Sequence, residues 1–133
     1  MTLNILIVDD DEEILELFKL MLEFEGYDVD TAVCGKEAIE KATKKNYYLA
    51  LLDFILPDIK GTDIASILYE ERRIQNVLFV TGYSHIFDFI DPKIRDRCKV
   101  LFKPVSRDTL NKTVREAFEP VDMLGAPELV TEN

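Results

Sequence analysis

The chain has 133 residues, of which 47% are apolar and 32% are charged. This size and balance predict one domain with its own core and exclude intrinsic disorder and fibrous repeats. There are 16 Lys and Arg residues against 26 Asp and Glu residues, which gives a net charge of −10. The basic residues form no stripe of the kind that phosphate backbones require, so direct binding to nucleic acid or to an anionic membrane is disfavoured.

The longest apolar run covers residues 47–52, far short of the ~20 residues that a membrane-spanning helix needs. The N-terminus leads directly into a strand-like segment, so we expect neither export nor membrane insertion. Cys34 and Cys98 lie far apart without CxxC spacing, which disfavours a disulfide framework and a cysteine metal site. These features predict a cytoplasmic protein with reduced thiols.

Short apolar runs alternate with longer segments of helical periodicity, a pattern typical of a parallel sheet covered by helices on both faces. Apolar residues at helical spacing predict three helices, around residues 14–22, 38–42 and 64–68. β-branched and large apolar residues predict five strands, at residues 4–9, 28–33, 48–53, 77–81 and 100–102. The predicted fold class is therefore α/β.

Two further helices are predicted from their start signals. Ser106 is a good N-cap and precedes apolar residues at helical spacing, so a helix should begin there. The segment 84–98 is interrupted by Pro92; with Asp91 as N-cap and Pro92 in the first helical position, it predicts only a short helix.

The end of the chain loses helical periodicity. Pro120, Gly125 and Pro127 interrupt the sequence after Phe118, and such residues favour turns and irregular chain. We therefore expect a domain over residues 1–119, followed by a tail or linker stub over residues 120–133.

Polar residues end four of the predicted strands. Asp9 and Asp10 follow the first, Asp53 the third, Thr81 ends the fourth, and Lys103 follows the fifth. In an open α/β sheet, ligands bind beyond the carboxyl ends of the strands, so these side chains would share one edge. Each residue also has a purely structural interpretation, such as a helix cap, a turn, ordinary strand or a solvated charge. Their joint placement favours a site.

The segments ILIVDDDEEI, LLDFILPDIKG, FVTG and FKP carry these residues in this order. With them the chain resembles the receiver domain of two-component response regulators, from about Leu3 to Phe118. The resemblance implies a flavodoxin-like, doubly wound sheet of five parallel strands in the order 2-1-3-4-5, with helices on both faces; chemotaxis receivers are known examples of this order.

Three carboxylates about 4–5 Å apart would repel by roughly 3–4 kcal/mol per pair at an effective dielectric constant near 20. A bound divalent cation would offset this cost, and oxygen ligands suit Mg²⁺. The resemblance implies that Asp10 and Asp53 bind Mg²⁺ directly, that Asp9 binds it largely through water, and that the backbone carbonyl of Ile55 is a further ligand.

The resemblance also implies the chemistry. Asp53 would accept a phosphoryl group from the phosphohistidine of a sensor histidine kinase or phosphotransfer protein. Lys103 would stabilise the transferred oxygens, Thr81 would hydrogen-bond to one of them, and Pro104 follows a peptide that the family often holds cis. The protein would be a phosphoacceptor that catalyses its own phosphorylation and slow dephosphorylation, and would switch its surface for a downstream effector protein.

The readout region departs from the family pattern. Val100 stands where the family usually has Tyr or Phe, so the usual aromatic switch is in doubt, and Phe102 on the same strand face is either a substitute or an ordinary core residue. The surface formed by residues 84–98 and the fifth strand is where the resemblance places the readout and a homodimer contact.

Three residues in the loops that follow the predicted third and fourth strands also suggest specific roles. Ile55 and Tyr83 are bulky and offer no group to orient water, so they either slow dephosphorylation or serve only as loop packing. Gly61 is expected to adopt a positive φ in the turn before the third helix.

Two other function classes stay open. A phosphohydrolase of the haloacid-dehalogenase type also uses an aspartyl nucleophile with Mg²⁺, but it needs a second Asp at the position that Ile55 occupies here. A pseudo-receiver, which interacts without phosphorylation, is disfavoured by the complete set of site residues and kept open by Val100.

Overall fold

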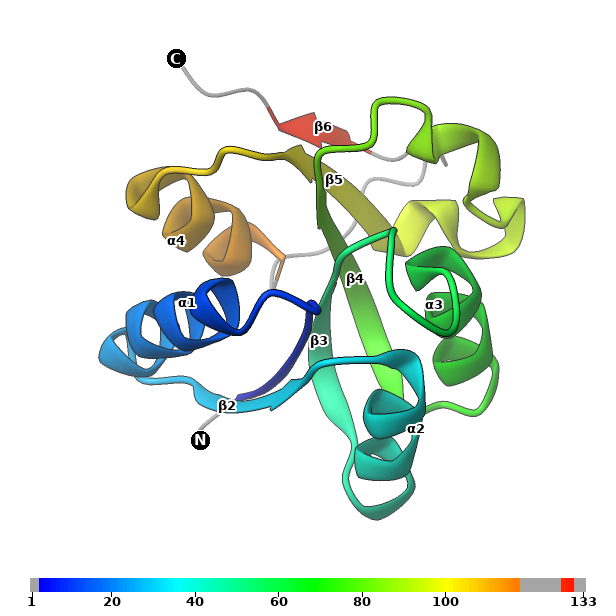
Figure 1. The fold of residues 1–133 in the computed structure, drawn as a ribbon, viewed down its shortest axis with the longest axis horizontal. Coiled ribbons are helices and arrows are strands. Elements are labelled where there is room, and N and C mark those ends of the chain that lie inside the picture. The colour runs from blue at the N-terminus through cyan, green and yellow to red at the C-terminus, as the bar shows by residue number, and fades with distance from the viewer. Residues whose placement is uncertain (1–2, 118–127, 131–133) are drawn as a thin grey trace.

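The computed structural model describes residues 3–117 and 128–130. Parallel strands form one sheet through the middle of the molecule, in the order β2-β1-β3-β4-β5-β6 (Figure 1). The predicted order of the first five strands is confirmed. The bounds are β1 (Asn4–Val8), β2 (Asp28–Ala32), β3 (Tyr47–Leu52), β4 (Ile74–Thr81), β5 (Cys98–Phe102) and β6 (Glu128–Val130).

Helices cover both faces of the sheet, as predicted. α1 (Glu12–Phe24) and α4 (Arg107–Glu116) lie on one face, and α2 (Gly35–Lys44) and α3 (Gly61–Glu70) lie on the other (Figure 1). Side chains of β1 alternate between the two faces: Ile5 and Ile7 join the core beneath α1 and α4, while Leu6 and Val8 join the core beneath α2 and α3. The sheet is thus buried on both sides.

Local caps explain where several helices begin. Ser106 accepts a hydrogen bond from the Thr109 amide at the start of α4, as its sequence predicts. Asp91 accepts one from the Lys93 amide, with Pro92 in the first helical position. The segment 84–98 forms two short 3₁₀ helices, η1 (Ile86–Phe89) and η2 (Pro92–Arg97). The prediction of a short helix after Asp91 is confirmed.

The first three strands match their predicted bounds to within one residue, whereas β5 begins at Cys98, two residues earlier than expected, and β4 and β6 differ further. β4 begins at Ile74, earlier than expected, and already pairs with Tyr47 of β3 there. The low strand propensity of Asn76 concealed this start, but Asn76 is buried and donates a hydrogen bond to the Tyr48 carbonyl at 3.3 Å. β6 lies within the segment predicted to be a tail, and its backbone pairs in parallel with β5. Residues 120–127 and 131–133 lie outside the described residues, and the division into a domain and a tail stays a prediction. Within the described residues, no helix is long and apolar enough to cross a membrane.

Candidate functional site

The carboxyl ends of β1, β3 and β5 bring three charged residues to one edge of the sheet. The Asp53 amide donates to the Val8 carbonyl at 3.0 Å, and the Lys103 amide donates to the Thr81 carbonyl at 2.9 Å. These backbone hydrogen bonds extend the strand pairing by one residue on each side of the site. Asp9, Asp53 and Lys103 are therefore positioned by the sheet itself rather than by mobile loops.

Lys103 forms a bridge between two carboxylates. Its Nζ lies 2.7 Å from Oδ2 of Asp9 and 2.9 Å from Oδ2 of Asp53. The side chain of Asp9 is 5% exposed and that of Asp53 is 12% exposed. The sequence placed these residues at one edge, and the structure adds that a single ammonium group holds both.

Burial and ion pairing have opposite effects on the pKa values of Asp9 and Lys103. Burial raises the pKa of Asp9, although Lys103 and the amide of Asp11 stabilise its charged form. Burial also opposes the charge on Lys103, but the hydrogen bonds that Lys103 donates to Asp9 and Asp53 outweigh it and raise the pKa of Lys103. The ammonium group of Lys103 therefore stays charged, whereas burial still makes the charged form of Asp9 energetically unfavourable.

Asp10 completes an acidic cluster. One carboxylate oxygen from each of Asp9, Asp10 and Asp53 lies within 4.8 Å of the others, and Asp10 is exposed. All of the possible metal ligands in this cluster are oxygen atoms, which suit a hard divalent cation and not a metal that prefers sulfur or nitrogen. Excess negative charge and the chemistry of the donors fit Mg²⁺.

Thr81 ends β4 and is buried, with 1% of its surface exposed. Its hydroxyl accepts a hydrogen bond from the Tyr83 amide at 3.2 Å. Among the described residues, neither Asp53 nor Lys103 hydrogen-bonds with this hydroxyl. The structure therefore brings Asp9, Asp10, Asp53 and Lys103 together and leaves Thr81 at the adjacent strand end. The peptide between Lys103 and Pro104 is cis, as expected.

Gly61 is required for a different reason from the one predicted. Among the described glycines, Gly26 has a positive φ of 97° and Gly61 does not, so the prediction for Gly61 is wrong. A Cβ on Gly61 would lie 1.9 Å from the carbonyl oxygen of Asp53. The first turn of α3 thus touches the backbone of the candidate phosphoacceptor, and only glycine allows this approach.

Asp58 connects the loop after β3 to α2, and sequence reasoning missed it. Its carboxylate accepts hydrogen bonds from the amides of Gly35, Lys36 and Ile59, each at 2.8 Å. The amides of Lys36 and Gly35 contribute most to holding the pKa of Asp58 below its usual value. Cys34 occupies the N-cap position of α2 and provides no capping side chain. Because Cys34 cannot cap the helix, the sequence indicated that the first amides of α2 need an acceptor from elsewhere in the chain.

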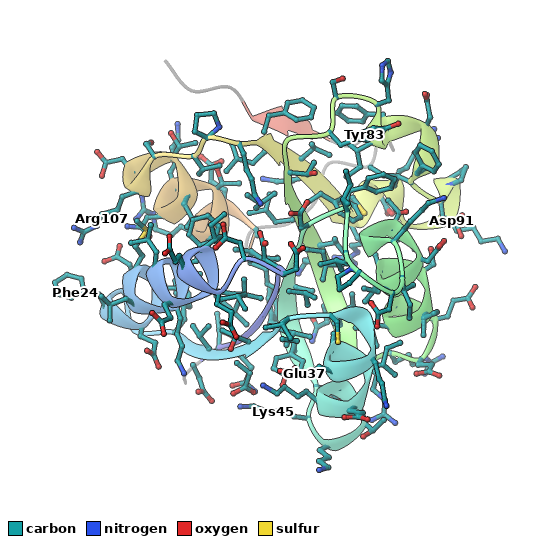
Figure 2. All side chains as sticks on the ribbon, in the orientation of Figure 1. Phe24, Glu37, Lys45, Tyr83, Asp91 and Arg107 are labelled. Atoms are coloured by element: carbon teal, nitrogen blue, oxygen red, sulfur yellow. The ribbon has the colours of Figure 1, made fainter. Side chains whose placement is uncertain are left out.

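An aromatic group links the loops after β3 and β4. Tyr83, labelled near the top of Figure 2, stacks on Phe54 with ring centroids 4.9 Å apart and an interplanar angle of 17°. Phe54 also contacts Phe89 of η1 at 4.9 Å. The Tyr83 ring therefore has a packing role, while Ile55 is 61% exposed. Their influence on dephosphorylation stays a prediction.

The fifth strand carries no exposed aromatic switch at position 100. Val100 is fully buried and pairs with Phe79. Phe102 is half-buried, packs against the core, and meets Phe87 of η1 edge to face at 6.3 Å. Phe102 thus behaves as a packing residue in this conformation.

Comparison with known proteins identifies the family. The family model described as the response regulator receiver domain matches residues 5–115. The chain belongs to the response regulator receiver domains. A receiver domain protein from Methanospirillum hungatei has a similar structure, with 32% identity and a TM-score of 0.75 over 87% of this chain and 93% of that one. Another is the regulator TrrA of Thermotoga maritima, solved in complex with Mg²⁺ and BeF, with 31% identity and a TM-score of 0.74 over 89% of this chain and 100% of that one.

Longer relatives contain a similar receiver segment. The alkaline phosphatase synthesis regulator PhoP of Bacillus subtilis is 33% identical over 86% of this chain and 48% of its own length. The transcriptional regulatory protein TrcR of Mycobacterium tuberculosis is 31% identical over 85% of this chain and 44% of its own length. The receiver chain thus spans less than half the length of these relatives.

Proposed function

We propose that this receiver domain accepts a phosphoryl group on Asp53 from a phosphohistidine of a sensor histidine kinase or phosphotransfer protein. The observation that carries the proposal is the bridge from Lys103 to Asp9 and Asp53, at 2.7 and 2.9 Å, at the carboxyl end of the sheet. It places a fixed positive charge beside a carboxylate that is only 12% exposed. Family membership supports the same assignment.

In the transfer, an oxygen of Asp53 attacks phosphorus while the bond between phosphorus and the imidazole nitrogen breaks. The electron pair of that bond returns to the imidazole, which leaves as a neutral ring because its other nitrogen carries a proton. The ammonium group of Lys103 stabilises the negative charge on the phosphoryl oxygens. The Thr81 hydroxyl, which accepts a hydrogen bond from the Tyr83 amide, then donates its own proton in a hydrogen bond to a phosphoryl oxygen.

Asp9, Asp10 and Asp53 would hold Mg²⁺, with the Ile55 carbonyl as a further ligand. When bound, the ion supplies electrostatic stabilisation of the phosphoryl oxygens. The acidic cluster within 4.8 Å supports this assignment, and TrrA, a relative at 31% identity, was solved with Mg²⁺ and BeF.

Phosphorylation of Asp53 would alter the loops after β3 and β4. The two loops would change together, because the ring stack of Phe54 and Tyr83 joins them. A downstream effector protein would then recognise the surface formed by η1, η2 and β5, where a homodimer contact is also proposed. Direct nucleic-acid binding is not part of the proposal, and a cytoplasmic location stays a prediction. Position 55 is Ile, so nothing favours the phosphohydrolase alternative.

Treatment with acetyl phosphate and Mg²⁺ tests the assignment. We expect mass spectrometry to find one labile phosphoryl adduct, mapped to Asp53 after reductive trapping and absent from Asp53→Asn. Asp88→Asn, an exposed carboxylate on η1, is the matched control and should be modified normally. An adduct that persists in Asp53→Asn contradicts the proposal, and no adduct in any form favours the pseudo-receiver alternative.

A further inference from the structure

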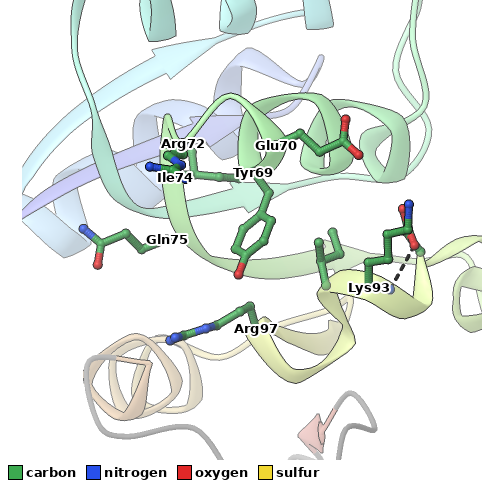
Figure 3. A pocket seen from close by; sticks show the side chains of 9 residues that line it. Tyr69, Glu70, Arg72, Ile74, Gln75, Lys93 and Arg97 are labelled. Carbon is green, nitrogen blue, oxygen red and sulfur yellow. Dashed lines mark hydrogen bonds between the residues drawn. The ribbon is translucent and has the colours of Figure 1, made fainter.

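A cavity of about 570 Å³ lies between the C-terminal end of α3, the start of β4 and η2 (Figure 3). This volume lies in the range usual for sites that bind small organic molecules. Ile74 lines the cavity and begins β4, whereas Thr81 ends the same strand. The cavity is thus at the opposite end of the sheet from the acidic cluster.

Three positive side chains line this cavity although the chain has a net charge of −10: Arg72, Lys93 and Arg97. Within the part of the chain that the structure describes, none of the three forms an ion pair. Glu70 and Asp91 also line the cavity, and the Asp91 carboxylate caps η2 as well. The lining therefore carries three positive and two negative side chains, an excess of one positive charge in a chain that is negative overall.

The charges are arranged around an aromatic ring. Tyr69 extends from α3 across the cavity toward η2, with Arg97 beyond its hydroxyl (Figure 3). Arg72 lies at the same end as Gln75, while Glu70 lies on the other side of Tyr69, the side on which Lys93 also lies (Figure 3). Guanidinium groups present a planar fork of donors that matches phosphate oxygens, and an aromatic face accepts a planar group.

The backbone at Arg72 adds an independent observation. Arg72 has a φ of 59°, in the left-handed region, directly after α3. Its amide donates to the Tyr69 carbonyl at 3.0 Å, and the Arg73 amide donates to the Leu68 carbonyl at 2.8 Å. Glycine is the residue that best suits this helix ending. An arginine here gives up backbone stability and places a guanidinium group at the cavity.

We propose that this cavity binds a small planar molecule that carries a phosphate group. The phosphate would lie between Arg72 and Arg97, and the planar part would lie against Tyr69. A phosphate monoester carries close to two negative charges, which matches two guanidinium groups better than a single carboxylate does.

Titration of the ¹⁵N-labelled protein with phenyl phosphate, in EDTA, tests the proposal by NMR. We expect saturable, millimolar binding, with shifts concentrated at residues 69–75 and 91–97. Arg97→Gln and Arg72→Gly should each weaken binding about tenfold, the value of one charged hydrogen-bond partner. Arg115→Gln, which removes the same charge from α4, should bind as the wild type does. Arg72→Gly should melt no lower than the wild type, which separates lost binding from lost folding.

Five results would overturn the proposal, four of them with phenyl phosphate and phenol and the fifth with benzoate. The first four are no saturable shifts, equal affinity of both cavity variants and the wild type, shifts centred on Lys103 at the strand ends, and binding of phenol as tight as that of phenyl phosphate. Benzoate serves as the carboxylate comparison, and equal affinity for benzoate would reject the preference for phosphate.

Discussion

Lys103 determines the electrostatic state of the candidate site at the scale of single residues. It joins Asp9 and Asp53, which are nearly buried and belong to one cluster of carboxylates that could hold a metal ion. A bound Mg²⁺ would share these carboxylates with the ammonium group. We therefore expect Lys103 and the ion to contribute overlapping stabilisation rather than independent stabilisation.

Lys103→Met should make this overlap measurable. Without metal, the variant should lose about 1–3 kcal/mol of unfolding free energy, because two buried carboxylates lose their cation. Mg²⁺ should then stabilise Lys103→Met more than it stabilises the wild type. The measurement is urea denaturation in EDTA and in millimolar Mg²⁺.

Lys112→Met on α4 is the matched control, because Lys112 is 70% exposed and forms only a marginal ion pair. It should respond to Mg²⁺ as the wild type does. An equal effect of Mg²⁺ on the wild type and on Lys103→Met would show that the two cations do not share ligands.

The N-terminus of α2 illustrates how one element depends on another. Its first amides are capped by Asp58, which belongs to the loop between β3 and α3. That loop also contacts Gly61, whose amide donates to the Phe54 carbonyl at 2.9 Å. The candidate phosphoacceptor, the start of α2 and the start of α3 are therefore mechanically connected.

Asp58→Ala should speed amide hydrogen exchange at Gly35 and Lys36 several-fold, since these amides lose their acceptor. The lowered pKa of Asp58 also predicts an acid effect. A carboxyl whose pKa is lowered by folding stabilises the folded state above its unfolded pKa of 3.8 and loses this effect as pH falls through its lower folded pKa. Protection of the two amides should therefore decrease below about pH 4 in the wild type.

Asp63→Ala provides the comparison, because Asp63 is an exposed carboxylate in the first turn of α3. Its exchange at Gly35 and Lys36, corrected for intrinsic rates, should match the wild type at every pH. Equal acid sensitivity in Asp58→Ala would assign the effect to another group.

At the scale of the whole molecule, β6 changes which strand forms the edge of the sheet. Its backbone pairs with β5 from Lys99↔Glu128 to Leu101↔Val130. β5 is part of the surface proposed for effector and homodimer contacts. An unpaired edge strand is prone to pair with another chain, so β6 would limit contacts through this edge.

A chain truncated after residue 119 should self-associate more than the full chain, because the backbone groups of β5 lose the pairing with β6. Sedimentation velocity over a range of concentrations measures this change. A chain that lacks only residues 131–133 keeps β6 and should behave as the full chain does. If both truncated forms sediment like the full chain, β6 does not protect the edge.

The sequence alone determined those features that depend on neighbouring residues. Side-chain periodicity indicated the alternating strands and helices, and caps that act within three residues marked the starts of α4 and η2 at Ser106 and Asp91. The polar residues at the strand ends indicated the site, because parallel strands in a doubly wound sheet bring their carboxyl ends to one edge. The motifs at these strand ends also indicated the family.

Only the tertiary structure decided which distant groups meet. Asp58 caps a helix that begins 23 residues earlier, and Gly61 is needed because a Cβ there would lie 1.9 Å from a backbone oxygen outside its own helix. The bridge at Lys103 joins strand ends separated by 94 and 50 residues, and the cavity beside η2 is lined by residues from α3, the start of β4 and η2. Local propensities act over a few residues, whereas these contacts depend on how whole elements pack, so no pattern within the sequence contains their distances.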